Sequence, residues 1–166
     1  MAKRITIYSL LTLFSLAVSY VEGIAFAFVP IPGFKIGIAN VVSMYLISKK
    51  QFFGGISINF TRIILAALLF GNFYSFIFSL AGGVLSTILV ILLSRVRVFS
   101  FAGVSCAAGL CHNVAQIIAA AVLTDTLGIT SLLPVMMISG AITGFISGTL
   151  LIIFEKKYSK ILNSIV

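Results

Sequence analysis

Charged residues are scarce in this sequence: 8% of its 166 residues are Asp, Glu, Lys or Arg, whereas 61% are hydrophobic. A water-soluble domain needs many more polar side chains to cover its surface, so the composition excludes one. At roughly 20 residues per span, a chain of this length can cross a bilayer about six times and has nothing left for a soluble domain. We therefore expect one transmembrane domain, residues 1–166.

Acidic residues and histidine are scarcer still, since the chain has only Glu22, Asp125, Glu155 and His112. Acid–base catalysis, nucleophile triads and two-metal chemistry need carboxylates or a paired base that this sequence does not supply. Its two cysteines, five residues apart in one apolar run, point in different directions on a helix and are not expected to bridge. No metal-ligand spacing and no phosphate-binding loop is present. We expect no enzyme activity, no metal and no cofactor.

The net charge of +8 does not indicate nucleic-acid binding, because the basic residues form small clusters between apolar runs. Such clusters stay in the cytoplasm. Placing both termini in the cytoplasm of a multi-pass plasma-membrane protein leaves only Lys35 outside and Arg62 within a span. The basic residues then inside are Lys3, Arg4, Lys49, Lys50, Arg95, Arg97, Lys156, Lys157 and Lys160.

The apolar runs predict an all-α, polytopic membrane bundle of six transmembrane helices. The expected spans are residues 5–28, 36–48, 52–71, 73–94, 99–123 and 130–154. The first run is longer than the roughly 7 to 15 residues of a secretory signal, so we expect it to be retained. The second is too short to cross in the ordinary way. It follows a segment with Pro30, Pro32 and Gly33, and non-helical backbone at membrane depth must be covered by protein or line a cavity.

Small residues recur every four positions in three of the expected spans, a pattern that lets helices approach closely in lipid. Either packing within the chain or contact with a partner subunit would explain them. The three series are Ser15, Ser19 and Gly23; Ser75, Ser79, Gly83 and Thr87; and Gly140, Gly144 and Gly148.

Arg62 lies about ten residues from either end of its span, too deep to reach the membrane surface easily. It requires an anionic or strongly polar partner. Two interpretations stand side by side: a structural ion pair with Glu22, or contact with a bound substrate. Both hold if a ligand competes with Glu22 for the guanidinium.

A second polar group lies in the fifth span, where His112 and Gln116 are four residues apart on one helix face, with Asn113 beside them. Three hydrogen-bonding side chains within one helical turn indicate a binding site rather than ordinary packing. Counting residues along each span places this polar group and the polar residues of the first three spans at similar depths, in the outer half of the membrane. We predict a site for a small anionic molecule made by Glu22, Lys35, Asn40, Arg62, His112, Asn113 and Gln116.

Several segments together resemble the Gx transporter family, which is often labelled heptaprenyl diphosphate synthase component I. The similarity covers about residues 22–120. The segments are PGFKIGIAN at 32–40, Arg62 with Gly71, SLAGGVLS at 79–86, GVS at 103–105 and HNVAQ at 112–116.

That family resembles the substrate-binding S components of energy-coupling-factor transporters. The resemblance implies six helices, cytoplasmic termini, an outward-facing pocket under the first loop, and partners comprising a membrane scaffold subunit and a pair of ATPases. Those partners engage an Ala-x-x-x-Ala pattern on the first helix, where this chain has Ser15, Ser19 and Gly23. Two alternatives remain: an accessory membrane subunit of prenyl diphosphate or quinone biosynthesis, and a structural anchor in a membrane redox complex.

Overall fold

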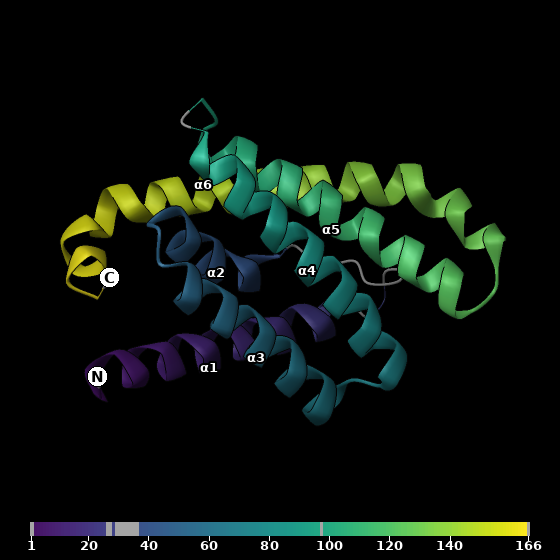
Figure 1. Cartoon of the computed structure of the whole chain (residues 1–166), viewed down its shortest axis with the longest axis horizontal. Coiled ribbons are helices and arrows are strands. Elements are labelled where there is room, and N and C mark those ends of the chain that lie inside the picture. Colours follow the sequence, from purple (N-terminus) through teal and green to yellow (C-terminus); the bar gives the residue numbers. More distant parts are fainter. Residues whose placement is uncertain (1, 26–27, 29–36, 97, 166) are drawn as a thin grey trace.

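The structure, a computed structural model, describes residues 2–25, 28, 37–96 and 98–165, and all regular structure in these ranges is helical. Figure 1 shows two groups of helices, with α1, α2 and α3 on one side and α4, α5 and α6 on the other. The elements are α1 (Ala2–Ala25), α2 (Ile38–Ser48), α3 (Phe52–Phe70), α4 (Phe73–Arg95), α5 (Phe101–Leu123), the short 3-10 helix η1 (Leu127–Leu132) and α6 (Leu133–Ile165).

The prediction of an all-α membrane bundle is confirmed to this extent: five helices are long and apolar enough to cross a membrane, and α2 is shorter. At 1.5 Å per residue, the 11 residues of α2 extend only about 17 Å, roughly half of a hydrocarbon core. The predicted proline-rich loop at 29–35 lies outside the described residues. Six spans and cytoplasmic termini stay predictions.

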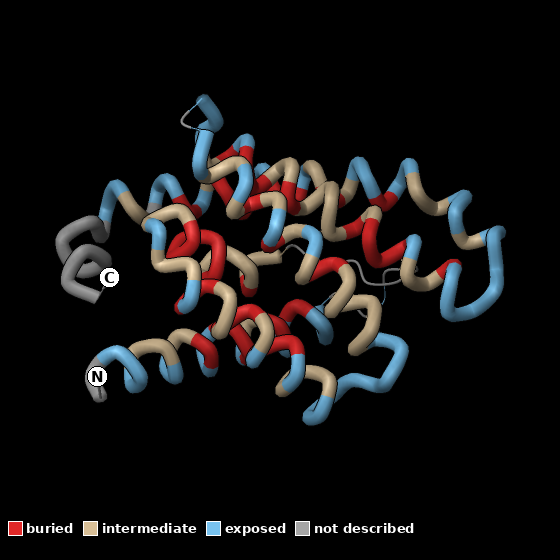
Figure 2. Tube along the Cα trace, in the orientation of Figure 1, coloured by how far each residue is buried: buried red, intermediate tan, exposed pale blue. Residues whose placement is uncertain are grey.

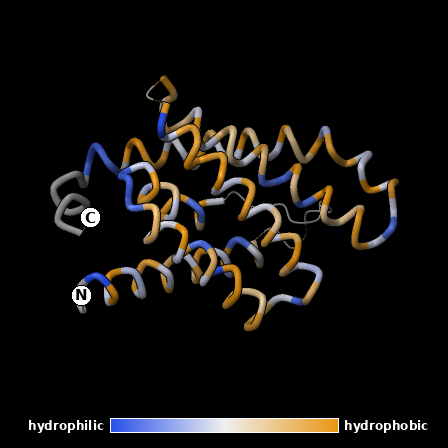
Figure 3. The backbone as a smooth tube through the Cα atoms, viewed as in Figure 1, coloured by the Kyte–Doolittle hydropathy of each residue, from blue (hydrophilic) through white to orange (hydrophobic). Residues whose placement is uncertain are grey.

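The surface of the bundle is apolar and part of its interior is polar, the reverse of a soluble protein. Figure 2 shows the buried residues on the sides where the helices face one another, and Figure 3 shows apolar positions along the outer sides. Large side chains such as Leu68, Val122 and Phe145 are exposed, whereas Ser15, Ser19 and Thr87 are buried. This distribution fits a chain surrounded by lipid.

The short helix α2 lies at the centre of the fold. Its Met44 and Ile47 pack with Val90 of α4 and with α5. Its Tyr45 and Leu46 pack with Ile58 of α3 and with α6. Because α2 contacts the other helices over only part of the membrane depth, the space beyond its N-terminus is left for other groups.

Glycines bring α5 and α6 into backbone contact. A Cβ atom at Gly148 would lie 2.7 Å from Ala102 Cα, and one at Gly144 would overlap the backbone of Ser105. Gly140 likewise faces Gly109. The four-residue series in the last span is therefore packing within the chain.

The other two series are only partly packing surfaces. Gly83 of α4 leaves room for Ile63 of α3, and Ser15 and Ser19 of α1 are buried. Gly23 is different, since a Cβ atom there would have no neighbour within 4 Å among the described residues. At Gly23 the described residues therefore give no support to packing within the chain, and contact with a partner subunit stays a prediction there.

The last helix extends beyond the expected span, residues 130–154. Helix α6 continues to Ile165, and Glu155 forms an ion pair with Lys49, which follows α2. The apolar run ends near residue 154, but the polar residues after it continue the helix. The ion pair ties the end of α2 to α6.

Candidate functional site

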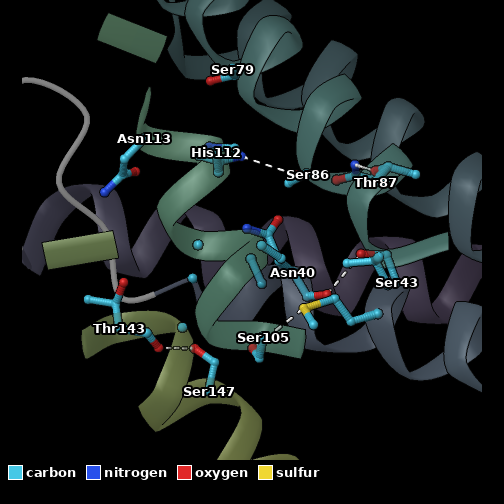
Figure 4. Close-up of a pocket in the computed structure, with 18 of the residues that line it drawn as sticks. Asn40, Ser43, Ser79, Ser86, Thr87, Ser105, His112, Asn113, Thr143 and Ser147 are labelled. Atoms are coloured by element: carbon cyan, nitrogen blue, oxygen red, sulfur yellow. Dashed lines mark hydrogen bonds between the residues drawn. The ribbon is translucent and has the colours of Figure 1, made fainter. Parts of the chain in front are cut away.

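A cavity of about 80 Å³ lies at the centre of the bundle and is lined by residues of all six α-helices. Figure 4 shows part of its lining, with Asn40 near the middle, His112 above it and Ser147 below. At about 15 Å³ for each enclosed water, the cavity has room for about five water molecules. This volume suits the ring or head group of a small molecule.

Arg62 is the central charge of this cavity and is 8% exposed. Its Nη1 donates a hydrogen bond to Ser19 Oγ at 2.7 Å. Its Nη2 donates to Asn40 Oδ1 at 2.6 Å and to Asn59 Oδ1 at 2.9 Å. Neutral oxygens from three helices thus hold the guanidinium in one orientation.

Glu22 also lines the cavity and is buried, but its carboxylate has a second function. Oε1 accepts a hydrogen bond from the backbone N–H of Ile38 at 2.8 Å, at the first residue of α2. The carboxylate therefore caps α2 while attracting Arg62 electrostatically. Gly37, just before α2, has φ 81°, a left-handed conformation that glycine adopts without strain.

Asn59 was not predicted, although it lies three residues before Arg62 and hence on the same face of α3. Its Nδ2 donates to Thr87 Oγ1 at 3.0 Å and lies 3.5 Å from Gly83 O. These contacts with α4 hold the Asn59 oxygen toward Arg62. The three-residue spacing of Asn59 and Arg62 is the feature of the sequence that could have predicted this contact. Ser19 could be found only as part of its small-residue series.

His112 lies on the α5 side of the cavity, where its Nδ1 is 3.5 Å from Ser86 Oγ of α4 (Figure 4). The ring packs directly on Gly82, because a Cβ atom there would lie 2.8 Å from it. The close approach of α4 and α5 therefore depends on this glycine.

Asn113 and Gln116 have different surroundings. Asn113 Nδ2 donates to Met136 O at 2.8 Å and to Ser139 Oγ at 3.3 Å, which ties α5 to α6. Gln116 is also buried and lines the cavity, but its Oε1 accepts no hydrogen bond from the described part of the chain. The predicted cluster thus contains one amide that ties α5 to α6 and one whose oxygen is buried without a hydrogen-bond partner among the described residues.

Six of the seven predicted site residues line the same cavity, and the seventh, Lys35, lies outside the described residues. What they bind stays a prediction. Hydroxyl groups complete the lining, but their polarity alone did not indicate that they converge. They include Ser43, Ser86, Thr87, Ser105, Thr143 and Ser147.

No group of three His, Cys, Asp or Glu side chains that could hold a metal ion occurs in the part of the chain that the structure describes. Cys106 and Cys111 are free thiols, as their spacing predicted.

A family model described as heptaprenyl diphosphate synthase component I matches residues 11–153. This chain belongs to that family. The match spans both polar groups, from Glu22 on α1 to Gln116 on α5, together with most of α6. The searches of curated proteins and of solved structures found no match to this chain.

Proposed function

We propose that this chain is the membrane-embedded, substrate-binding subunit of an uptake system for a small anionic molecule. The observation that supports this most is a buried guanidinium beside a central cavity. Arginine has five N–H donors, of which three bond to neutral oxygens of the described residues. The other two are available to a carboxylate or phosphate, which arginine binds well in its planar geometry.

The arrangement of Glu22 supports an anionic ligand rather than a closed ion pair. Its Oε1 bonds to the N-terminus of α2, so part of its charge is directed at the helix instead of at Arg62. An incoming anion can therefore share Arg62 with Glu22 without removing the cap. Lys35 would add a second positive charge.

Transport itself would require other subunits, because this sequence has no nucleotide-binding loop. In this proposal a membrane scaffold subunit and a pair of ATPases energise uptake through the plasma membrane. The substrate enters from outside, above the N-terminus of α2, and both chain termini face the cytoplasm.

The family description favours a second candidate function. A protein labelled as component I of a synthase could be an accessory membrane subunit of prenyl diphosphate synthesis. It would then contact a soluble catalytic subunit and influence the product, and Arg62 would have a structural role.

Native mass spectrometry of the chain purified alone separates the two candidates. We expect the wild-type protein to retain a small molecule, Arg62→Met to lose it, and Lys50→Met, an exposed change in the α2–α3 turn, to retain it. Re-adding the molecule should raise the melting temperature as RT ln(1 + [L]/Kd) requires. An empty wild-type protein that instead co-purifies with a soluble synthase would refute uptake and support the accessory role.

A further inference from the structure

The side-chain amide of Asn40 is held in one orientation by Arg62. Arginine carries hydrogen-bond donors and no acceptor. The Asn40 atom that lies 2.6 Å from Arg62 Nη2 is therefore the carbonyl oxygen, Oδ1. Oδ1 and Nδ2 point in different directions from the same carbon, so the N–H₂ group of Asn40 is directed away from the guanidinium. The chemistry of Arg62 alone fixes this orientation.

The Asn40 nitrogen has no hydrogen-bond acceptor in the described part of the chain, where the one bond of this amide is the one that Oδ1 accepts. Asn40 is partly exposed and lines the cavity, and Figure 4 shows its side chain near the middle of the lining. A Cβ atom at Gly37 would lie 3.7 Å from Nδ2 and 3.9 Å from Ser147 Oγ, and both of these residues also line the cavity. An N–H₂ group with two unused donors thus lies on the cavity, next to the guanidinium.

Asn59 contacts the same arginine nitrogen but has its own amide nitrogen bonded. Its Oδ1 accepts from Arg62 Nη2 at 2.9 Å, and its Nδ2 donates to Thr87 Oγ1 at 3.0 Å. Support of Arg62 therefore uses only the oxygen of each asparagine, which a carboxylate could also provide. The amide nitrogen of Asn40 takes no part in this support.

We propose that Asn40 donates directly to the anionic group of the substrate, which deepens the function proposed above and rests on it. The unbonded N–H groups of Arg62 contact one oxygen of that group, and Asn40 Nδ2 contacts another. Donors on two different side chains favour an oxyanion, a carboxylate or a phosphate, because it carries several acceptor oxygens on one centre. Arg62 and Asn40 together form the anion subsite.

The position of Asn40 in α2 supports an anion at this point. Asn40 is the third residue of α2, within the first turn, where the helix dipole favours negative charge. Glu22 already caps this end of α2 at the Ile38 N–H, and its carboxylate offsets part of the charge of Arg62. Because the guanidinium alone then attracts a second anion only weakly, a neutral donor beside it adds to the binding.

Replacing Asn40 with aspartate separates its two roles. Asn40→Asp keeps an oxygen for Arg62 and adds a favourable charge to the first turn of α2, but it removes the N–H₂ group. We expect this variant without ligand to melt at or above the wild-type temperature. Asn59→Asp is the matched control, because it places the same charge against the same Arg62 nitrogen and removes only a donor that is bonded within the chain.

Saturation-transfer NMR on the detergent-solubilised full chain measures binding of three small probes: acetate, methylphosphonate and acetamide. Wild type should bind at least one of the two anions more tightly than acetamide, the neutral counterpart of acetate. Tighter binding of acetate identifies a carboxylate substrate, and tighter binding of methylphosphonate identifies a phosphate. For the preferred anion, Asn40→Asp should raise the dissociation constant at least tenfold more than Asn59→Asp does, as expected for one hydrogen bond to a charged group.

The inference fails if the two aspartate variants weaken anion binding equally, since Asn40 would then act only by holding Arg62. It also fails if wild type binds neither anion more tightly than acetamide. The proposed function is judged separately. Anion binding that is lost in Arg62→Met but is equal in the two aspartate variants would leave anion uptake standing. A wild-type protein that binds neither anion and retains no molecule in native mass spectrometry would contradict both.

Discussion

Arg62 is the residue of this chain whose insertion into the membrane costs the most free energy. An arginine at the centre of a membrane helix costs roughly 2.5 to 3.5 kcal/mol on insertion scales. Ser19, Asn40 and Asn59 offset part of this cost by accepting its hydrogen bonds. A residue needed only for packing would not require such a set of partners from three helices.

Replacing Arg62 with methionine should lower the stability of the ligand-free protein. The change leaves three buried oxygens without their donor, and each unsatisfied buried group costs about 1 to 3 kcal/mol, offset in part by the removal of a buried charge. We expect a net loss of a few kcal/mol in detergent, measured as a fall in melting temperature. Arg62→Lys should recover part of it, because an ammonium has three donors but no planar fork. A melting temperature that rises in Arg62→Met would contradict the network.

The Lys49–Glu155 ion pair makes a pH-dependent contribution to stability. The hydrogen bond to Glu155 raises the pKa of Lys49 above 10.5, so the pair stabilises the fold fully below pH 10.5 and loses this effect as the pH rises through the raised pKa. Because both side chains are partly exposed, we expect less than about 1 kcal/mol.

Comparing the melting temperatures of wild type and Lys49→Met across pH measures this contribution. The difference should be constant from pH 7 to 9 and should shrink above pH 10.5. Lys50→Met serves as the control, because Lys50 is exposed. A difference in melting temperature that grows as the pH becomes more alkaline would contradict the predicted direction of this pH dependence.

At the scale of residues, the sequence indicated the costly groups but not their partners. Arg62, Glu22 and His112 stand out because ionisable residues are rare in apolar helices. Serine and threonine do not stand out, since they commonly bond to their own helix backbone. The structure was needed to show that Ser19 and Thr87 belong to the network around Arg62 and Asn59.

At the scale of elements, hydropathy located the helices within a few residues but not where α6 ends. An apolar run measures the thickness of the membrane, whereas a helix can continue beyond it, as α6 does to Ile165. Small-residue spacing marked Gly140, Gly144 and Gly148 as a surface of close approach but did not name α5 as the helix that meets it. On α1 the same spacing does not show which helix face meets a neighbour within the chain.

Gly144→Ala should disrupt the α5–α6 contact. Its methyl group would overlap the backbone of Ser105, which cannot move like a flexible side chain. Overpacking of this kind typically costs about 1 to 3 kcal/mol. Gly23→Ala is the matched control, since no described atom lies near its Cβ position, and alanine in a helix should gain roughly 0.5 to 1 kcal/mol. Thermal unfolding of both variants in the same detergent measures the contrast; equal melting temperatures would contradict the packing.

At the scale of the whole molecule, the start of α1, the end of α2 and the end of α6 lie at one end of the bundle. Figure 1 shows α1 beginning, α2 ending and α6 ending on the left, while the α3–α4 and α5–α6 connections lie on the right. In Figure 3 the left end carries hydrophilic positions at the start of α1, at the α2–α3 turn and late in α6. Retention of Lys and Arg clusters in the cytoplasm predicts that this end faces inward.

Cysteine labelling of intact cells tests the orientation. With Cys106 and Cys111 replaced by alanine, we expect Thr126→Cys, in the α5–α6 connection, to react with a membrane-impermeant maleimide. Lys50→Cys should react only after the cells are opened. The reverse pattern would invert the topology and place the cavity entrance on the cytoplasmic side.

The sequence predicted the helical membrane class and the collection of six polar residues in one place, because depth within a span can be counted along each helix. It could not predict the shape of the space between them. That space depends on where the short α2 ends and on which hydroxyls of α4, α5 and α6 face inward, and both are set by contacts between helices.

A density map of the chain purified from its native membrane tests the central claim most directly. We predict non-protein density in the cavity, within hydrogen-bonding distance of Arg62. A solid bundle without that cavity, in which the Arg62 guanidinium is fully bonded to the Glu22 carboxylate, would contradict the account.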